Sequence, residues 1–156
     1  MPELPEVETT IRYLESKVNG KKILSITTSK KKLRKNLHIK NFLAIEGSTI
    51  KSVDRKAKYI VLTLKPLKYL VIHLGMSGRL KFFNKKNYTN EKHDHVVMEF
   101  SQFNVVFNDP RRFGMFFMLE DDQELHNFFQ HYGVDLLLDS INYENIFLIF
   151  QKSMSP

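Results

Sequence analysis

Pro2 is the residue with the most distinctive chemistry in the chain. Cells commonly remove an initiator Met that precedes a small residue, and removal of Met1 would leave the secondary amine of Pro2 as the terminal group. The pKa of an α-amino group is about 7.7–8.0, against about 10.4 for Lys, and the positive end of a nearby helix lowers it. Attack by such an amine on the C1′ carbon of a sugar gives an iminium ion, which promotes elimination. Glu3 could exchange a proton with the departing group. The plain start of a helix explains the same residues, so both interpretations stay open on this segment alone.

The basic residues are concentrated in one part of the sequence. Residues 20–90 contain 18 Lys or Arg and 2 acidic residues, whereas residues 120–150 contain 7 acidic residues and no Lys or Arg. The densest basic run comprises Lys30, Lys31, Lys32, Arg34, Lys35 and Lys40. This asymmetry favours a polyanionic partner whose binding depends on salt concentration. A solvated basic loop explains the run at 30–40 equally well.

Length and composition indicate one globular domain. A chain of 156 residues can bury a real core, and a hydrophobic content of 42% argues against disorder. No apolar run approaches the roughly 18 residues of a membrane span, and the acidic start lacks the layout of a secretory signal. We therefore expect an intracellular protein with no membrane partner. The absence of cysteine excludes disulfides and thiolate zinc sites.

Hydrophobic periodicity predicts a mainly β fold with flanking helices. One helical face gathers the apolar residues near the start of the chain: Leu4, Val7, Ile11, Leu14 and Val18. Pro5 suits the first turn of this helix, and Gly20 suits its end. Short β-rich runs follow at 23–27, 49–53, 59–64, 69–74, 80–83, 95–100, 105–108 and 113–119. About eight strands at this spacing predict a two-sheet β-sandwich after the N-terminal helix, with further helices at 124–131 and 142–152.

Five short motifs occur in order along the chain. They are MPELPEVE at the start, RKAKY at 55–59, HLGMSG at 73–78, KHDHV at 92–96 and DPRRFG at 109–114. Together they closely resemble the formamidopyrimidine-DNA glycosylase and endonuclease VIII family, and they are nearer to its formamidopyrimidine branch. The PELPEVE start is highly specific, whereas each of the other motifs is weak when taken alone. The resemblance extends over nearly the whole chain.

The resemblance implies three catalytic residues. Pro2 would be the nucleophile that forms a Schiff base with the sugar, and Glu3 would give a proton to the departing base. Lys58 would lie against a phosphate and supply the proton linked to β-elimination. From the sequence alone, Lys58 also fits an ordinary solvated lysine at the start of a strand.

The resemblance also implies a DNA-binding surface. Met76, Arg111 and Phe113 would fill the duplex where a damaged nucleotide has been extruded. Met and Phe would replace lost stacking, while Arg would offer a planar cation to the orphaned base. Without the resemblance, core packing would be the simpler explanation of Met76 and Phe113. Three further residues are implied as DNA-backbone contacts that position the duplex without reading its sequence: His73, His93 and Arg112.

The spacing of His93, Asp94 and His95 could indicate a metal site. No third ligand accompanies the two histidines, and alternation along a strand explains the same spacing. We expect no metal and no cofactor in this chain, because Pro2 itself supplies the nucleophile.

The chain departs from the resembled family in its length. Members of that family have a second, helical domain with a helix–two-turn–helix element and usually a four-cysteine zinc finger. We expect residues 1–150 to form the N-terminal catalytic β-sandwich domain and residues 151–156 to begin a truncated interdomain segment. Further phosphate contacts, the finger arginine linked to δ-elimination and much of the base pocket would then be missing. A single expressed domain, a truncated gene and one piece of a split protein with a separately encoded C-terminal half all stay open.

The function implied by the resemblance is base-excision repair. The chain would remove an oxidised purine, 8-oxoguanine or a formamidopyrimidine, from double-stranded DNA and then cleave the abasic site by β-elimination. The first alternative is an impaired remnant that binds damaged DNA without turnover, and the second is a folded fragment without function. We expect a monomer that is cytoplasmic or associated with the nucleoid.

Overall fold

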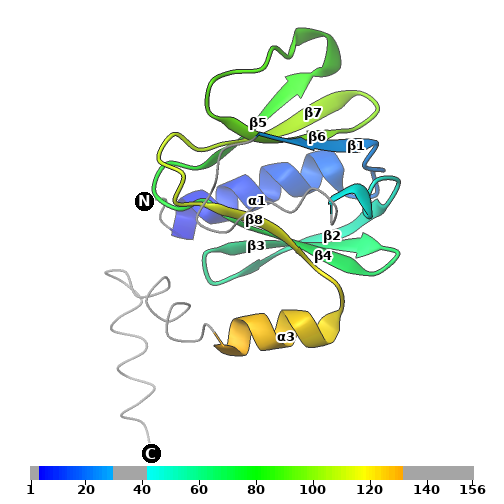
Figure 1. Ribbon diagram of the computed structural model, residues 1–156, viewed down its shortest axis with the longest axis vertical. Helices are drawn as coiled ribbons and strands as arrows, with labels where there is room; N and C mark the ends of the chain where they lie inside the picture. Colours follow the sequence, from blue (N-terminus) through cyan, green and yellow to red (C-terminus); the bar gives the residue numbers. More distant parts are fainter. Residues whose placement is uncertain (1–3, 30–41, 132–156) are drawn as a thin grey trace, which may run out of the picture.

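The computed structural model describes residues 4–29 and 42–131. Two sheets lie one above the other, with a helix along one side and a second helix beneath the lower sheet (Figure 1). The elements are α1 (Leu4–Val18), β1 (Ser25–Thr28), β2 (Thr49–Lys56), β3 (Tyr59–Lys65), β4 (Lys68–His73), β5 (Arg79–Asn84), the 3₁₀ helix η1 (Lys85–Asn87), β6 (Asp94–Glu99), β7 (Phe103–Asn108), β8 (Met115–Leu119) and α3 (Asp122–His131). No helix in this described part is long and apolar enough to cross a membrane.

Both sheets are four-stranded and antiparallel, which confirms the predicted β-sandwich. The upper sheet has the strand order β1-β6-β7-β5, and the lower sheet has the order β2-β3-β4-β8. Each of the eight predicted β segments overlaps one of these strands. The chain changes from the upper to the lower sheet between β1 and β2, crosses back to the upper sheet after β4 and returns to the lower sheet after β7.

Strands β3, β4 and β8 of the lower sheet are buried on both faces. Along β3, Ile60 and Leu62 point into the core between the sheets, whereas Tyr59 and Val61 pack beneath the sheet, in the cluster that includes Phe128 of α3. Strands covered on both sides need apolar residues at successive positions, because alternate side chains point to opposite faces. The continuous apolar runs of β3, β4 and β8 are therefore explained by α3, which lies below this sheet (Figure 1).

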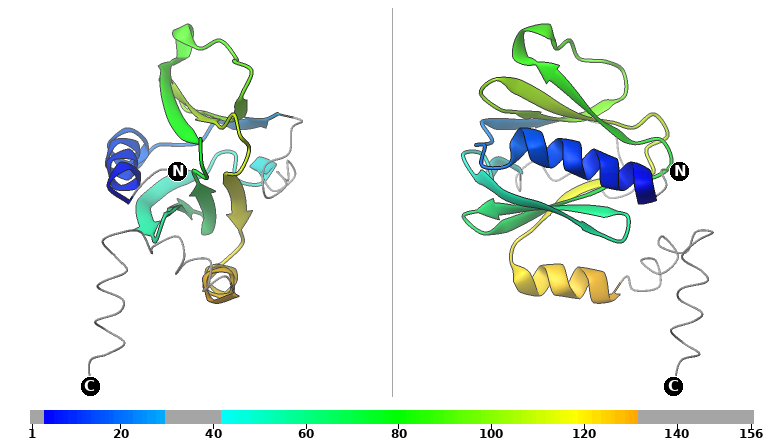
Figure 2. Two further views of the ribbon diagram at one scale, coloured as in Figure 1. Left: turned by 90° about the vertical axis from the view of Figure 1, so that its left-hand side faces the viewer. Right: turned by 180° about the vertical axis from the view of Figure 1, so that it is seen from behind.

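Helix α1 covers the side of the sandwich and packs against β2. Its buried residues are Val7, Ile11, Leu14 and Val18, four of the five predicted for its apolar face. Leu4, the fifth, is only partly buried. Figure 2 shows from behind that α1 runs along the side where the two sheets meet. Burial of this single face fixes the helix to the sandwich.

Several element boundaries differ from the prediction, and two of these differences have an identifiable physical cause. The strand predicted from 113 begins at Met115, because the chain first turns at Arg112, whose φ is 60°. The helix predicted from 124 begins at Asp122, where the side chain of Asp121 accepts a hydrogen bond from the Glu124 amide at 2.9 Å. That bond satisfies an amide in the first helical turn. The predicted helix at 142–152 and the basic run at 30–40 lie outside the described residues.

Candidate functional site

The strand register brings most of the predicted site residues to one end of the sandwich. In the lower sheet His73 pairs with both Tyr59 and Met115, and in the upper sheet Arg79 pairs with Asn108. The β4–β5 and β7–β8 connections between the sheets therefore leave and enter at the same end. We name residues 74–78, after β4, the first crossover loop and residues 109–114, after β7, the second crossover loop. The start of α1 lies at this end too (Figure 1).

The two crossover loops touch through their backbones. Gly75 has a φ of 62°, and a Cβ at this position would lie 2.6 Å from the nitrogen of Gly114 and 2.6 Å from the carbonyl carbon of Phe113. A Cβ on Gly114 would in turn lie 2.7 Å from the carbonyl oxygen of His73. Since such distances are far shorter than van der Waals contact, only glycine permits this approach. The glycines of the two motifs are thus required by contact between the loops.

The Asp109 carboxylate ties the two crossover loops together. Its side chain is fully buried, and Oδ1 accepts a hydrogen bond from the Ser77 hydroxyl at 2.7 Å. Oδ2 accepts one from the Gly114 amide at 2.8 Å. The Ser77 oxygen also accepts a hydrogen bond from the Arg111 amide at 2.9 Å. One buried carboxylate therefore sets the relative position of both loops.

The tips of the crossover loops expose large apolar side chains. Met76 on the first loop is 44% exposed, and Phe113 on the second is 48% exposed. The guanidinium of Arg111 lies 5.7 Å from the centre of the Phe113 ring, within the range of a cation–π contact. Core packing, the simpler explanation of Met76 and Phe113, does not fit these exposures. The structure places these three residues, which are predicted to fill the duplex and are called the wedge below, on two adjoining loops that Asp109 joins at their base.

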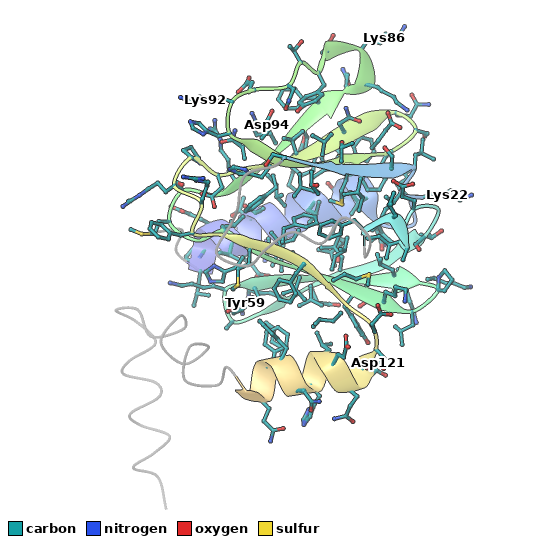
Figure 3. The ribbon with its side chains drawn as sticks, in the orientation of Figure 1. Lys22, Tyr59, Lys86, Lys92, Asp94 and Asp121 are labelled. Atoms are coloured by element: carbon teal, nitrogen blue, oxygen red, sulfur yellow. The ribbon has the colours of Figure 1, made fainter. Side chains whose placement is uncertain are left out.

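His73 and Lys58 are buried near the base of the loops. His73 is 3% exposed, its Nδ1 accepts a hydrogen bond from the Gly75 amide at 3.0 Å, and its ring lies 4.7 Å from that of Tyr59. Figure 3 labels Tyr59 on the lower sheet, where its ring packs edge-on against Phe128. Lys58 is 6% exposed and follows Ala57, a turn residue with a φ of 53°. An ordinary solvated lysine does not fit this burial.

The KHDH segment has its polar groups engaged by the protein. His93 is partly exposed, and its carbonyl oxygen accepts a hydrogen bond from the Asp109 amide at 3.0 Å. His95 is 1% exposed; its Nε2 donates to the Asp109 carbonyl oxygen at 2.8 Å, and its Nδ1 lies 3.2 Å from the Ser29 hydroxyl. Within the described ranges, no group of three or more His, Asp or Glu residues could hold a metal ion. Asp94 and His95 are the first two residues of β6, whereas His93 lies before the strand.

Arg112 is exposed on the second crossover loop, and its amide donates to the Asp109 carbonyl oxygen at 3.3 Å. Pro2 and Glu3 lie outside the described residues, so their predicted roles rest on the sequence. The next residue, Leu4, begins α1 at the end of the sandwich where the crossover loops lie (Figure 1).

Sequence reasoning missed the buried residues that hold this site. The sequence motifs contain Asp109, Asp94 and His95 but do not show that these residues support the site. In the structure each of them is buried and hydrogen-bonded. A signal was present, since each is a polar residue that adjoins or begins an apolar strand. Such positions demand an internal partner.

The architecture and the loops at its end define a class of protein: a β-sandwich domain that presents an apolar and cationic tip from two clasped loops. The description of the matching family is "Formamidopyrimidine-DNA glycosylase N-terminal domain", and the match covers residues 1–116. The chain belongs to this family.

Curated relatives and solved structures agree with this assignment. The formamidopyrimidine-DNA glycosylase of Zymomonas mobilis is 40% identical over 158 residues, which cover 100% of this chain and 57% of the relative. That of Wolbachia pipientis from Culex pipiens is 39% identical over 143 residues, or 91% of this chain and 52% of the relative. A crystal structure of the Lactococcus lactis Fpg with DNA containing an abasic site matches with a TM-score of 0.74 and 31% identity, over 83% of this chain and 48% of that one. The chain spans about half the length of the relatives it matches.

Proposed function

We propose that this chain is a base-excision repair glycosylase domain that acts on oxidised purines in duplex DNA and cleaves the resulting abasic site. The observation that carries the proposal is the exposed tip formed by Met76, Arg111 and Phe113 on clasped loops. These side chains suit the space left in a duplex by an extruded nucleotide. Lactococcus lactis Fpg, a structural relative, has been crystallised with DNA that contains an N7-benzyl-Fapy-dG lesion. Such a protein works inside the cell on chromosomal DNA.

The proposed chemistry uses the terminal amine of Pro2. Its nitrogen attacks C1′ of the extruded nucleotide, the bond from C1′ to the base breaks, and the base leaves with a proton from Glu3. The proton on the attached nitrogen passes to the ring oxygen O4′ as the bond between C1′ and O4′ breaks, so that the sugar opens to an iminium ion. This cation acidifies the hydrogen on C2′. Loss of that proton and cleavage of the bond between C3′ and its phosphate oxygen complete the β-elimination. Lys58, a buried residue at this end of the fold, would lie against the phosphate and supply a proton during elimination.

The remaining residues would hold the duplex. His93 and Arg112 are on the surface beside the tip and would contact the DNA backbone. His73 is buried and holds the first crossover loop, so any contact that it makes with a phosphate would use the ring edge opposite Nδ1. We propose no metal or cofactor for this chemistry. A separately encoded C-terminal half is the proposed partner if the chain does not act alone.

Binding without turnover is the second candidate, and the observation in its favour is length. The chain covers 52% of the Wolbachia relative, and this candidate assumes that residues 1–156 alone do not form a complete base-binding pocket. An abasic site needs no base pocket and has no base to unstack. The two candidates therefore differ most clearly on abasic DNA.

The experiment compares two duplexes under single-turnover conditions at low salt, one with an abasic site and one with 8-oxoguanine. We expect measurable cleavage of the abasic duplex by the processed protein and much weaker release of 8-oxoguanine. Loss of both activities together, with binding retained, would support the remnant instead. Full activity on 8-oxoguanine would show that residues 1–156 suffice for release of the base.

A further inference from the structure

The loop between β5 and β6 is anchored to the upper sheet by one carboxylate. The Asp94 side chain is fully enclosed, with an exposure of 0%. On the side of the sheet, Oδ1 accepts a hydrogen bond from Asn108 Nδ2 at 2.9 Å and lies 3.1 Å from Lys81 Nζ. On the side of the loop, Oδ2 accepts hydrogen bonds from the Tyr88 hydroxyl at 3.0 Å and from the Glu91 amide at 2.8 Å. Each oxygen thus serves a different part of the fold.

A second layer of contacts surrounds this carboxylate. Lys81 also pairs with Glu91 at 3.1 Å, and the Tyr88 ring packs on Phe83 at 5.2 Å between centres. Burial opposes ionisation of Asp94, yet the hydrogen bonds from Asn108 and the other donors outweigh it, and the pKa of Asp94 lies below its ordinary value. The carboxylate is therefore an anion at neutral pH that is contacted by four donors from the sheet and the loop.

This anchor lies directly beside the candidate DNA-binding surface. His93 precedes Asp94, and its carbonyl oxygen is bonded to the amide of Asp109 in the second crossover loop. Asn108, which binds the anchor, is the last residue of β7 before that loop. Figure 3 places Asp94 among the strands of the upper sheet and Lys92 at the outer edge of the same loop. The end of the β5–β6 loop and the second crossover loop are consequently fixed to one another.

We infer that Asp94 is a positioning residue: it fixes the loop that ends at His93, so that Lys92 and His93 meet the DNA backbone beside the wedge. This inference rests on the proposed function, because it assumes that the crossover loops face DNA. A preset loop would bind phosphates without losing conformational entropy at the moment of binding. The role of Asp94 is confined to binding, since none of its contacts reaches the start of α1 where the proposed chemistry occurs.

The test uses the full chain and a duplex with a tetrahydrofuran abasic analogue. Asp94→Asn keeps the shape of the side chain, but its amide group cannot accept from donors on both sides, so either the sheet or the loop loses its bond. We expect roughly tenfold weaker binding and a log–log salt slope smaller by about one unit, the loss of one phosphate contact. Tyr88→Phe removes only one hydroxyl and should weaken binding by about threefold, near the lower end of the range for a single hydrogen bond. This milder variant keeps the inference testable if Asp94→Asn does not fold.

The matched control is Glu99→Gln. Glu99 is on the same strand, and its contact with Lys85 at 3.5 Å ties the opposite end of the same loop. We expect its binding and salt slope to equal those of the unchanged protein. Borohydride trapping on a true abasic site, measured at saturating protein, should proceed at the same rate in all these variants, because the amine is unaffected.

A double-mutant cycle separates positioning from general stabilisation. His93→Ala should weaken binding in the unchanged protein but have little further effect when combined with Asp94→Asn. The inference would be overturned if His93→Ala weakened binding equally in both backgrounds, or if Asp94→Asn left the affinity and the salt slope unchanged. In either case, trapping by the unchanged protein would still support the proposed function. Failure of the unchanged protein both to bind and to be trapped would refute the proposed function and, with it, the role of Asp94.

Discussion

Replacement of Asp109 by Ala should separate the two crossover loops. The substitution removes two hydrogen bonds to a fully buried carboxylate, one from Ser77 at 2.7 Å and one from Gly114 at 2.8 Å. Ser77 is partly exposed and can turn its hydroxyl to water, but Gly114 is buried and its amide would be left without an acceptor. Bonds to charged groups contribute about 1.5–3 kcal/mol each, and a buried unpaired group costs about 1–3 kcal/mol. We expect a loss of about 3–5 kcal/mol in the free energy of unfolding.

Asp109→Asn provides a graded comparison. An amide can accept from Gly114 and donate to the Ser77 oxygen, so that only the contribution of the charge is lost and the expected cost is about 1 kcal/mol. Asp54→Ala is the matched control, since Asp54 is an exposed carboxylate that accepts from the Ser52 hydroxyl at 3.2 Å. This control should change stability by no more than about 0.5 kcal/mol.

Urea unfolding followed by circular dichroism measures these differences, and anisotropy with the tetrahydrofuran duplex measures binding. Asp109→Ala should also weaken binding, because Met76 and Phe113 would no longer be held together. A cost below about 1 kcal/mol for Asp109→Ala, or equal effects of Asp109→Ala and Asp54→Ala, would show that this carboxylate does not hold the loops.

Three further outcomes are expected. Gly75→Ala should weaken binding of the abasic duplex and lower the melting temperature, because its Cβ would clash with Gly114. Wild-type values in both assays would contradict the close backbone contact between the two crossover loops. Phe113→Ala should slow release of an oxidised purine more than cleavage of an abasic site in single-turnover assays. Stability should change little because Phe113 is 48% exposed. Equal slowing of both reactions would contradict the proposed role of Phe113 in filling the duplex. The pKa of Asp94 is lower in the folded protein than in the unfolded chain, so its stabilising effect is present above about pH 4 and disappears as the pH falls through the folded value. The difference in melting temperature between the unchanged protein and Asp94→Asn should therefore shrink below about pH 4, and a constant difference from pH 7 to pH 3 would exclude this linkage.

The sandwich was predictable because its strands carry a strong pattern. Runs such as Tyr59–Lys65 are apolar at nearly every position, and only a strand covered on both faces or a buried helix segment fits such a run. Glycine residues and the Asp109-Pro110 pair mark the turns between these runs. The sequence did not reveal where β8 begins, because the turn at Arg112 and the bond from Gly114 to Asp109 depend on contacts with another loop.

The site was predictable in its surface residues and not in its supports. Motif resemblance located Met76, Arg111 and Phe113, and the structure brings them to one end of the fold. Asp109 binds Ser77, which is 32 positions away in the chain, so no local sequence pattern predicts this contact. The burial of Lys58 was equally hidden, since the covering of a turn depends on tertiary packing. The roles of Pro2 and Glu3 stay predictions.

The most direct test of the proposed mechanism is borohydride trapping followed by mapping of the adduct. Processed protein, with Met1 shown by mass analysis to be removed, is incubated with duplex DNA containing an abasic site and then reduced. The proposed chemistry predicts a covalent complex whose DNA remnant is attached to the peptide that begins with Pro2, and Pro2→Gly should weaken the trap. An adduct on a lysine side chain, or no adduct at saturating protein and low salt, would contradict the proposal that the terminal proline is the nucleophile.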